Sequence, residues 1–278
     1  MRHTRSISVA AAAVVGLAAL SACSAASTAA SHAASSADSA VSTVADALSL
    51  ATTKTESYNS VKMNMSMTVA GQNVTSSGQF GWNPMAMTMG MNMPAANGRP
   101  ATSMIMMMSG TTMYMGTPTA ADFQGKHWMK LDLSSLQGGQ ALTQLATQSG
   151  NQNPAVQLKL LTSSPGVTRV GQGTVDGVQA THYRGTVDLK ALAAKMAGQD
   201  AQLKSLLTSA SQQGMTTETV DLWVSDQNLP VRETISAATS SGAQNATIDF
   251  SDYSTSTVTV TPPPADDTLD ASSLLGSD

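Results

Sequence analysis

Apolar and polar residues alternate with a period of two along residues 61–69 and 85–93, and the apolar positions are mostly methionine. Phe80 and Trp82 continue this spacing between the two stretches, and residues 104–108 and 113–115 are again rich in methionine. Alternation of this kind is typical of strands with one apolar face. Fourteen of the chain's 18 methionines lie between residues 61 and 115. The pattern predicts an antiparallel meander with one face lined by thioethers.

Methionine is an unusual residue for such a face, because sheets more often use the stiff, β-favouring Val and Ile. An unbranched and polarizable side chain can repack around objects of different shape. We therefore expect a cavity or groove for a flexible apolar ligand, while a core simply filled by methionine is the structural alternative. The predicted ligand-binding residues are Met63, Met65, Met67, Phe80, Trp82, Met87, Met89, Met91, Met106, Met113 and Met115.

The rest of the chain combines short helices with further strands. Helices are predicted over residues 41–56, after an Asn153-Pro154 cap, and as a pair over residues 188–214, with a weaker one near residues 141–145. Asp176-Gly177 is typical of a two-residue hairpin, and further strands are predicted between residues 220 and 260. This order predicts an α+β fold with a curved antiparallel sheet, either in two halves or as one sheet wrapped around helices.

Two segments flank the predicted ligand face as candidate lids, the helix pair of residues 188–214 and the loop of residues 116–125. Three consecutive prolines at residues 262–264 cannot join a hydrogen-bonded ladder. We therefore expect the fold to end there and residues 262–278 to form a disordered acidic tail.

The N-terminus resembles a bacterial lipoprotein signal peptide. Basic residues at positions 2, 3 and 5 precede an apolar segment, residues 7–20, that is short for a membrane span. The segment ends at Leu20-Ser21-Ala22-Cys23, which is similar to a lipobox. The resemblance implies that residues 1–22 are removed, that Cys23 carries a diacylglyceryl group, and that residues 23–40 form a flexible Ala- and Ser-rich tether. An ordinary secretory signal with an incidental cysteine is the alternative.

Composition excludes several functions. The net charge is −4 and only 12% of residues are charged, so the sequence offers no basic patch for nucleic acid. Cys23 is the only cysteine, which leaves no internal disulfide. Beyond the tether only His127 and His182 remain as histidines, and no nucleophile elbow occurs. We therefore predict neither an enzyme nor a cofactor, and we expect each histidine to have a local partner.

Copper binding is a further alternative, because thioethers select Cu(I). Two methionines in Met-x-Met on one strand lie about 6.6 Å apart, since each residue rises ~3.3 Å. A single ion would therefore need sulfurs from neighbouring strands, and we assign no metal ligands.

Several features together resemble one family of envelope proteins. They are the lipobox and tether, the helix leading into a strand, the residues 128–132 (Trp-Met-Lys-Leu-Asp), the hairpin through His182-Tyr183, and Leu222-Trp223-Val224 followed by Leu229-Pro230-Val231-Arg232. Residues 41–261 resemble the LppX/LprG-type lipoproteins of actinobacteria. This resemblance implies a LolA/LolB-like half-barrel that binds lipid or acyl chains and carries them across the envelope, anchored on the extracytoplasmic face of the cell membrane and working with a transport partner. A structural or partner-binding envelope module without a ligand is the alternative.

Overall fold

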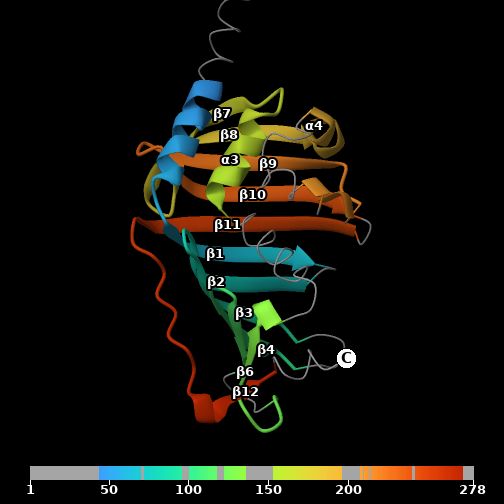
Figure 1. Ribbon diagram of the computed structural model, residues 1–278. Helices are drawn as coiled ribbons and strands as arrows, with labels where there is room; N and C mark the ends of the chain where they lie inside the picture. Colours follow the sequence, from blue (N-terminus) through green and yellow to red (C-terminus); the bar gives the residue numbers. More distant parts are fainter. Residues whose placement is uncertain are drawn as a thin grey trace, which may run out of the picture. The chain divides into compact units, whose positions relative to one another are not determined.

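Twelve strands form one sheet in the computed structural model of the chain, in the order β12-β6-β5-β4-β3-β2-β1-β11-β10-β9-β8-β7 (Figure 1). The structure describes residues 44–271 except residues 70–71, 96–99, 118–121, 136–152, 196–206, 209, 213 and 240–241. All described residues belong to one unit, Val41–Asp278. The predicted signal peptide, Cys23 and the tether lie outside the described residues and stay predictions.

The methionine-rich stretches build the first arm of the sheet. Its strands are β1 (Ser60–Val69), β2 (Gln72–Trp82), β3 (Met85–Met93), β4 (Thr102–Ser109), β5 (Thr112–Gly116) and β6 (Trp128–Asp132), followed by the short 3-10 helix η1 (Leu133–Ser135). Each strand pairs antiparallel with the next one along the chain. The predicted meander is therefore confirmed.

The second arm is another antiparallel meander. It contains β7 (Thr168–Val175), β8 (Val178–Asp188), β9 (Thr217–Ser225), β10 (Pro230–Thr239) and β11 (Gly242–Ser254). Asp176 and Gly177 join β7 to β8 with φ angles of 48° and 84°, the left-handed values that a two-residue hairpin turn requires. The hairpin predicted from this dipeptide is confirmed.

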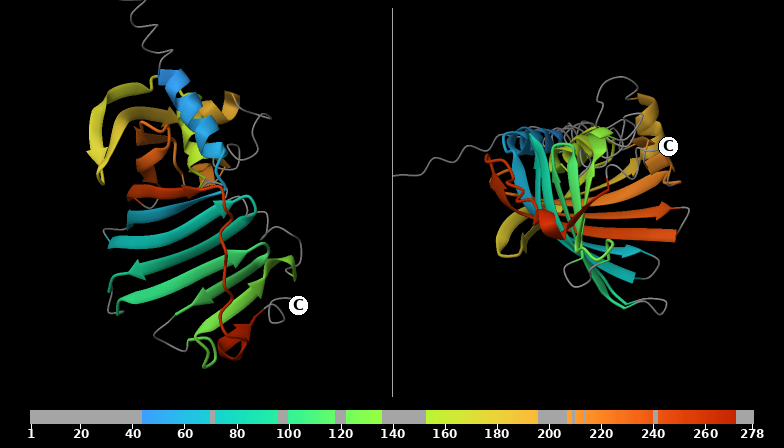
Figure 2. Two further views of the ribbon diagram at one scale, coloured as in Figure 1. Left: turned by 90° about the vertical axis from the view of Figure 1, so that its left-hand side faces the viewer. Right: turned by 60° about the horizontal axis from the view of Figure 1, so that its bottom comes forward.

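One strand pair joins the two arms, because β1 lies antiparallel to β11 with Met63 opposite Phe250 and Met65 opposite Ile248. The two predicted halves are thus one continuous sheet. Figure 2 shows that this sheet is curved and does not close on itself. The predicted α+β half-barrel is confirmed.

Helices cover the inner face of the second arm (Figure 1). They are the helix of residues 44–56, α3 (Pro154–Thr162) and α4 (Leu189–Lys195), while residues 207–208 and 210–212 are also helical. The Asn153 side chain accepts a hydrogen bond from the Ala155 N–H at 2.9 Å, and Pro154 is the first helical residue, as predicted. The helix predicted near residues 141–145 lies outside the described residues.

These helices pack on β8 and β9 through one apolar cluster. Its most buried members are Leu48, Ala51, Leu158, Leu160, Leu161, Val187, Val220 and Leu222. Leu189 and Leu192 of α4 belong to the same cluster. The segment that we proposed as a lid thus begins as part of the core, and residues 196–206 of it are outside the described residues.

The C-terminal segment corrects one prediction. The fold does not end at the three prolines: the 3-10 helix η2 (Ala265–Asp267) and strand β12 (Thr268–Asp270) follow them, and β12 pairs parallel with β6. Figure 2 shows the extended connection that carries the chain from β11 to this far edge. The prolines cannot donate backbone hydrogen bonds, but the residues that follow them carry N–H groups and can pair. The Ala271 N–H, for example, donates to the Lys130 carbonyl at 2.9 Å. Residues 272–278 lie outside the described residues.

Side chains fix this segment to the first arm. The Asp267 carboxylate lies 3.0 Å from His127 Nδ1 and accepts the His127 backbone N–H at 3.1 Å. Lys130 pairs with Asp270 at 3.0 Å. His127 holds the pKa of Asp267 below its ordinary value through these hydrogen bonds. We call residues 265–271 the edge latch.

Candidate functional site

The strand register brings the predicted ligand-binding residues onto one face. Residues directly opposite each other in an antiparallel pair point to the same side of the sheet. One row across the sheet is Phe250, Met63, Gly78, Met89, Met106, Met115 and Met129. The next is Val61, Phe80, Met87, Met108, Met113 and Leu131.

A third row contains Ile248, Met65, Ser76, Met91 and Met104. We call the inner side of β1–β6 the methionine face. All eleven residues predicted from the sequence lie on it, whereas Met107 points to the outer side with Thr88 and Tyr114. Their common face follows from the register, and their role in binding stays a prediction.

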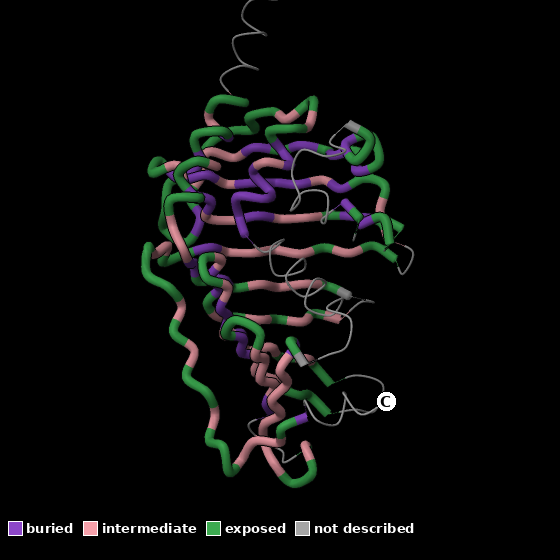
Figure 3. The backbone as a smooth tube through the Cα atoms, viewed as in Figure 1, coloured by how far each residue is buried: buried purple, intermediate pink, exposed green. Residues whose placement is uncertain are grey.

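The methionine face is packed at its centre and partly open around it. Met63 and Met108 are 1% exposed, and Phe80 is fully buried. They form one cluster with Val61, Met87, Met89 and Phe250, against which Trp82, Met85 and Met106 pack. Met65, Met67, Met91, Met104, Met113 and Met115 are only half-buried. Figure 3 shows the same contrast, with buried residues concentrated on β8–β10 and half-buried ones common on β3–β6.

A hollow of about 570 Å³ lies beside the methionine face rather than over it. It opens where β8–β11 end, and its lining includes Tyr58, Leu229, Val231, Phe250 and Tyr253. Phe250 is shared with the methionine cluster. The Tyr58 and Tyr253 rings meet edge to face with centroids 5.6 Å apart, and the Tyr253 hydroxyl donates to the Pro230 carbonyl at 3.0 Å.

Two buried carboxyls on the same inner side are functional candidates that sequence reasoning missed. Glu233 lies opposite Leu222 and Ile248 and is 1% exposed, and Glu218 lies opposite Ala237 and is 7% exposed. The Oε1 atom of each has no hydrogen-bond partner among the described residues. Burial raises the pKa of Glu233 to about 8, helped by the charge of Glu218, and burial raises the pKa of Glu218 to about 7. In the sequence, both glutamates occupy strand positions of β9 and β10 whose alternate neighbours are apolar. This pattern could have indicated that they face inward.

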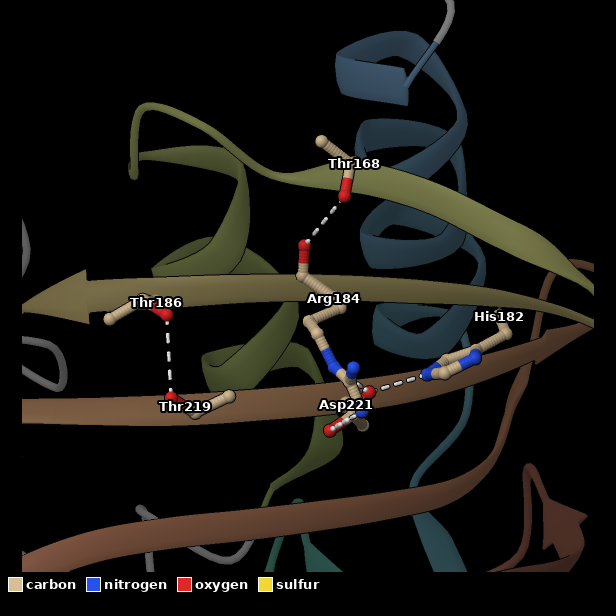
Figure 4. Close-up of polar contacts among 6 residues, drawn as sticks. All are labelled: Thr168, His182, Arg184, Thr186, Thr219 and Asp221. Atoms are coloured by element: carbon tan, nitrogen blue, oxygen red, sulfur yellow. Dashed lines mark hydrogen bonds and ion pairs between the residues drawn. The ribbon is translucent and has the colours of Figure 1, made fainter.

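The outer side of the second arm carries a polar network (Figure 4). The Asp221 carboxylate lies 2.5 Å from His182 Nε2 and accepts two hydrogen bonds from Arg184, at 2.7 and 3.2 Å. The His182 ring stacks on Trp223 at 4.2 Å with an interplanar angle of 5°. Asp221 raises the pKa of Arg184. Both domain histidines therefore have local partners, as predicted.

The described residues hold neither a metal-binding cluster nor a membrane-spanning helix. They contain no group of three or more His, Cys, Asp or Glu side chains suited to hold a metal ion. No helix within them has the length and apolar character needed to cross a bilayer.

Sequence comparisons find relatives in Streptomyces. The chain matches no family model. It is 41% identical over 165 residues to an uncharacterized 31.2 kDa Streptomyces griseus protein of the rplA–rplJ intergenic region. It is 34% identical over 166 residues to SCO4650 of Streptomyces coelicolor, which is named as a candidate lipoprotein. The matches cover 58% and 59% of this chain, and the chain spans about half the length of these relatives, 53% and 49%.

Structure comparisons give the fold. The chain superposes on LprF from Mycobacterium bovis with a TM-score of 0.51 and 15% identity, over 79% of this chain and 96% of LprF. The corresponding values for LppX from Mycobacterium tuberculosis are 0.47 and 12%, over 78% and 97%. The chain therefore shares its fold with LprF, although the two sequences are only 15% identical.

Proposed function

We propose that this protein is a lipoprotein of the cell envelope that is anchored through Cys23 and binds a lipid or another apolar ligand on its methionine face. The observation that carries the proposal is the register, which aligns thioethers from β1, β3, β4, β5 and β6 in continuous inner rows. The fold shared with LprF and the name of the S. coelicolor relative support it.

The physical basis is transfer of hydrocarbon from a bilayer to another apolar surface. Each methylene that leaves water gains roughly 0.8 kcal/mol, so a carrier must offer nearly equal burial. The half-buried methionines Met65, Met91 and Met104 have apolar area left to cover. Because methionine side chains adapt their rotamers, they can cover tails of different length and saturation. We place the protein on the extracytoplasmic side of the membrane, where it passes its ligand to a transport partner.

Native mass spectrometry tests the proposal. The full chain carrying Cys23→Ser, so that no lipid can be joined to a thiol, is purified from an actinobacterial host. We expect a population with bound lipid of defined mass, and uptake of a fluorescent fatty acid by the lipid-free protein. A single lipid-free mass together with no uptake would leave only an envelope module without an apolar ligand.

Cu(I) binding is a second candidate that one observation favours. Met89, Met106, Met115 and Met129 stand opposite one another on four neighbouring strands. Opposed side chains have Cβ atoms about 5 Å apart, so thioethers from adjacent strands can converge on one soft ion.

Titration with Cu(I) against a competing chelator tests this candidate. We expect Met106→Leu with Met115→Leu to weaken binding at least about tenfold. Met107→Leu is the matched control, because Met107 belongs to the same strand but points to the outer side. Equal affinity of the double variant and the control would exclude the site.

A further inference from the structure

The inner side of the sheet carries two buried carboxyls, and the cationic side chains of the described central strands do not face them. On strands β1–β6 and β8–β11, the described lysines and arginines are Lys62, Lys130, Arg184 and Arg232, and the register puts all four on the outer side. Arg169 faces inward on β7, but it is exposed on that edge strand. Glu233 and Glu218 are therefore inward carboxyls to which these four cationic side chains offer no partner.

Glu233 lies near the lining of the hollow. Val231, in its lining, precedes Glu233 by two residues on β10, and Phe250 follows Ile248, the residue opposite Glu233, by two residues on β11. Tyr253, also in the lining, is close enough for the charge of Glu233 to help raise its pKa. The lining contains the carboxylates of Asp226 and Asp252 and no lysine or arginine, although Lys62 pairs with Asp252 at 2.7 Å.

We propose that this hollow and the unpaired carboxyl of Glu233 beside it select an amphiphile whose head group is a protonated amine. An ammonium group has only hydrogen-bond donors, and it supplies the positive partner that the buried carboxyls lack. A hydroxyl head group cannot supply this positive charge, and a carboxylate head group repels an ionised carboxyl. The inference deepens the proposed function and rests on it.

The register also provides a path for the tail. From Glu233 an inner row runs toward the first arm through Ile248, Met65, Ser76, Met91 and Met104. With strands about 4.8 Å apart, the row extends roughly 24 Å from β10 to β4. A hydrocarbon chain with its amine at Glu233 would lie across the half-buried methionines. Burial raises the pKa of Glu233 to about 8, so the carboxyl is protonated at pH 7 without a cation, and an ammonium head group would displace this proton.

Three probes with the same tail and different heads test the inference. Dodecylammonium, dodecanol and dodecanoate are titrated below micelle formation into the full chain carrying Cys23→Ser. We expect dodecylammonium to bind about tenfold more tightly than dodecanol, because a charge-assisted bond replaces an unpaired carboxyl, and dodecanoate to bind most weakly.

Glu233→Gln should remove this preference, so that the amine and the alcohol bind about equally, and circular dichroism shows that the variant is folded. Glu56→Gln is the matched control. Glu56 is the chain's one glutamate besides Glu218 and Glu233, and it is exposed on the helix of residues 44–56, where it pairs with Lys159 at 2.8 Å. The control should keep the full preference.

The outcomes separate the two proposals. Equal binding of the three probes, or a preference for the amine that survives Glu233→Gln, would overturn the inference and leave an apolar ligand site in place. Absence of binding for all three probes would overturn the ligand site as well.

Discussion

Gly78 and Met89 face each other across β2 and β3, and the Met89 side chain occupies the space above the glycine. A Cβ atom at residue 78 would clash most closely with the Thr88 carbonyl oxygen, and it would lie 2.8 Å from the Met89 Cα and 2.9 Å from the Met89 sulfur. The inner row of methionines crosses β2 at Gly78, which contributes no side chain to the row. The glycine is therefore required by close approach of its neighbour.

We predict that Gly78→Ala lowers the free energy of unfolding by about 1–3 kcal/mol, because the added methyl overpacks the row. Gly90→Ala is the control, since a Cβ there would have Ser77 O as its nearest contact at 3.8 Å. Urea unfolding of both variants checks the difference. Equal stability of the two would contradict the packing described for Met89.

Met91 and Met104 form an opposed, half-buried pair on the inner side, and Asn92 and Ser103 form the adjacent pair on the outer side. We predict that Met91→Gln with Met104→Gln weakens dodecanol binding about tenfold or more, because amides of similar size replace apolar contact. Asn92→Gln with Ser103→Gln should bind as the parent does. Calorimetry measures both, and an equal loss in the two double variants would remove the methionine face from binding.

Glu233 should make stability depend on pH. Its pKa rises from 4.5 in the unfolded chain to about 8 in the folded one, so folding takes up a proton between these values. Stability is then highest below about pH 4.5 and falls as the pH rises toward 8, with a slope approaching 1.4 kcal/mol per pH unit.

Urea unfolding between pH 5 and pH 8 measures this slope. Glu233→Gln should flatten it, and the slope that remains should reflect Glu218, whose pKa is raised to about 7. Glu56→Gln should keep the slope of the parent. An unchanged slope in Glu233→Gln would show that the carboxyl is ionised in the folded protein.

The Asp221 network should stabilise the second arm. The Asp221 side chain is 11% exposed and pairs with both His182 and Arg184. Asp221→Asn removes the charge on which both contacts depend, and we expect a loss of about 1.5–3 kcal/mol in unfolding free energy. Asp226→Asn, on the exposed turn after β9, should change stability by less than about 0.5 kcal/mol. Thermal unfolding at pH 7 compares the two, and similar melting temperatures would argue against the network.

Removal of the edge latch should expose β6. Without residues 265–278, the β6 backbone loses its parallel partner and becomes an open sheet edge. We expect faster amide exchange in Trp128–Asp132, unchanged exchange in β8 and β9, and a greater tendency to self-associate. Hydrogen-exchange mass spectrometry and light scattering measure these effects. Unchanged protection of β6 would mean that the latch does not cover the edge in solution.

Local patterns made much of the fold predictable. The alternation around Met63 and Met87 identified strands and their apolar sides, because period two is a property of the backbone itself. Asn153-Pro154 and Asp176-Gly177 likewise determine a cap and a turn within a few residues. All residues proposed for the ligand face share one side for the same reason.

Long-range relationships were beyond such reasoning. The pairing of Met63 with Phe250 depends on how two distant arms meet, and no local preference encodes it. The hollow at Tyr58 and Tyr253 arises only where these arms end. Glu233 was overlooked because a glutamate is ordinarily placed at the surface, whereas here its alternation with Val231 and Ile235 puts it on the inner side. The strand after the prolines was missed because its partner β6 is remote in sequence.

The β1–β11 pair also determines the order in which the molecule can be assembled. A growing chain can form β1–β6 from contacts between strands that are neighbours in sequence. The pair of β1 and β11 forms only after residues as late as Ser254, the partner of Ser60, have been made. Closing so long a loop is slow compared with forming hairpins. During that interval one side of β1 and the thioethers beside it remain uncovered. A newly synthesised chain therefore exposes part of its methionine face until β11 has paired with β1.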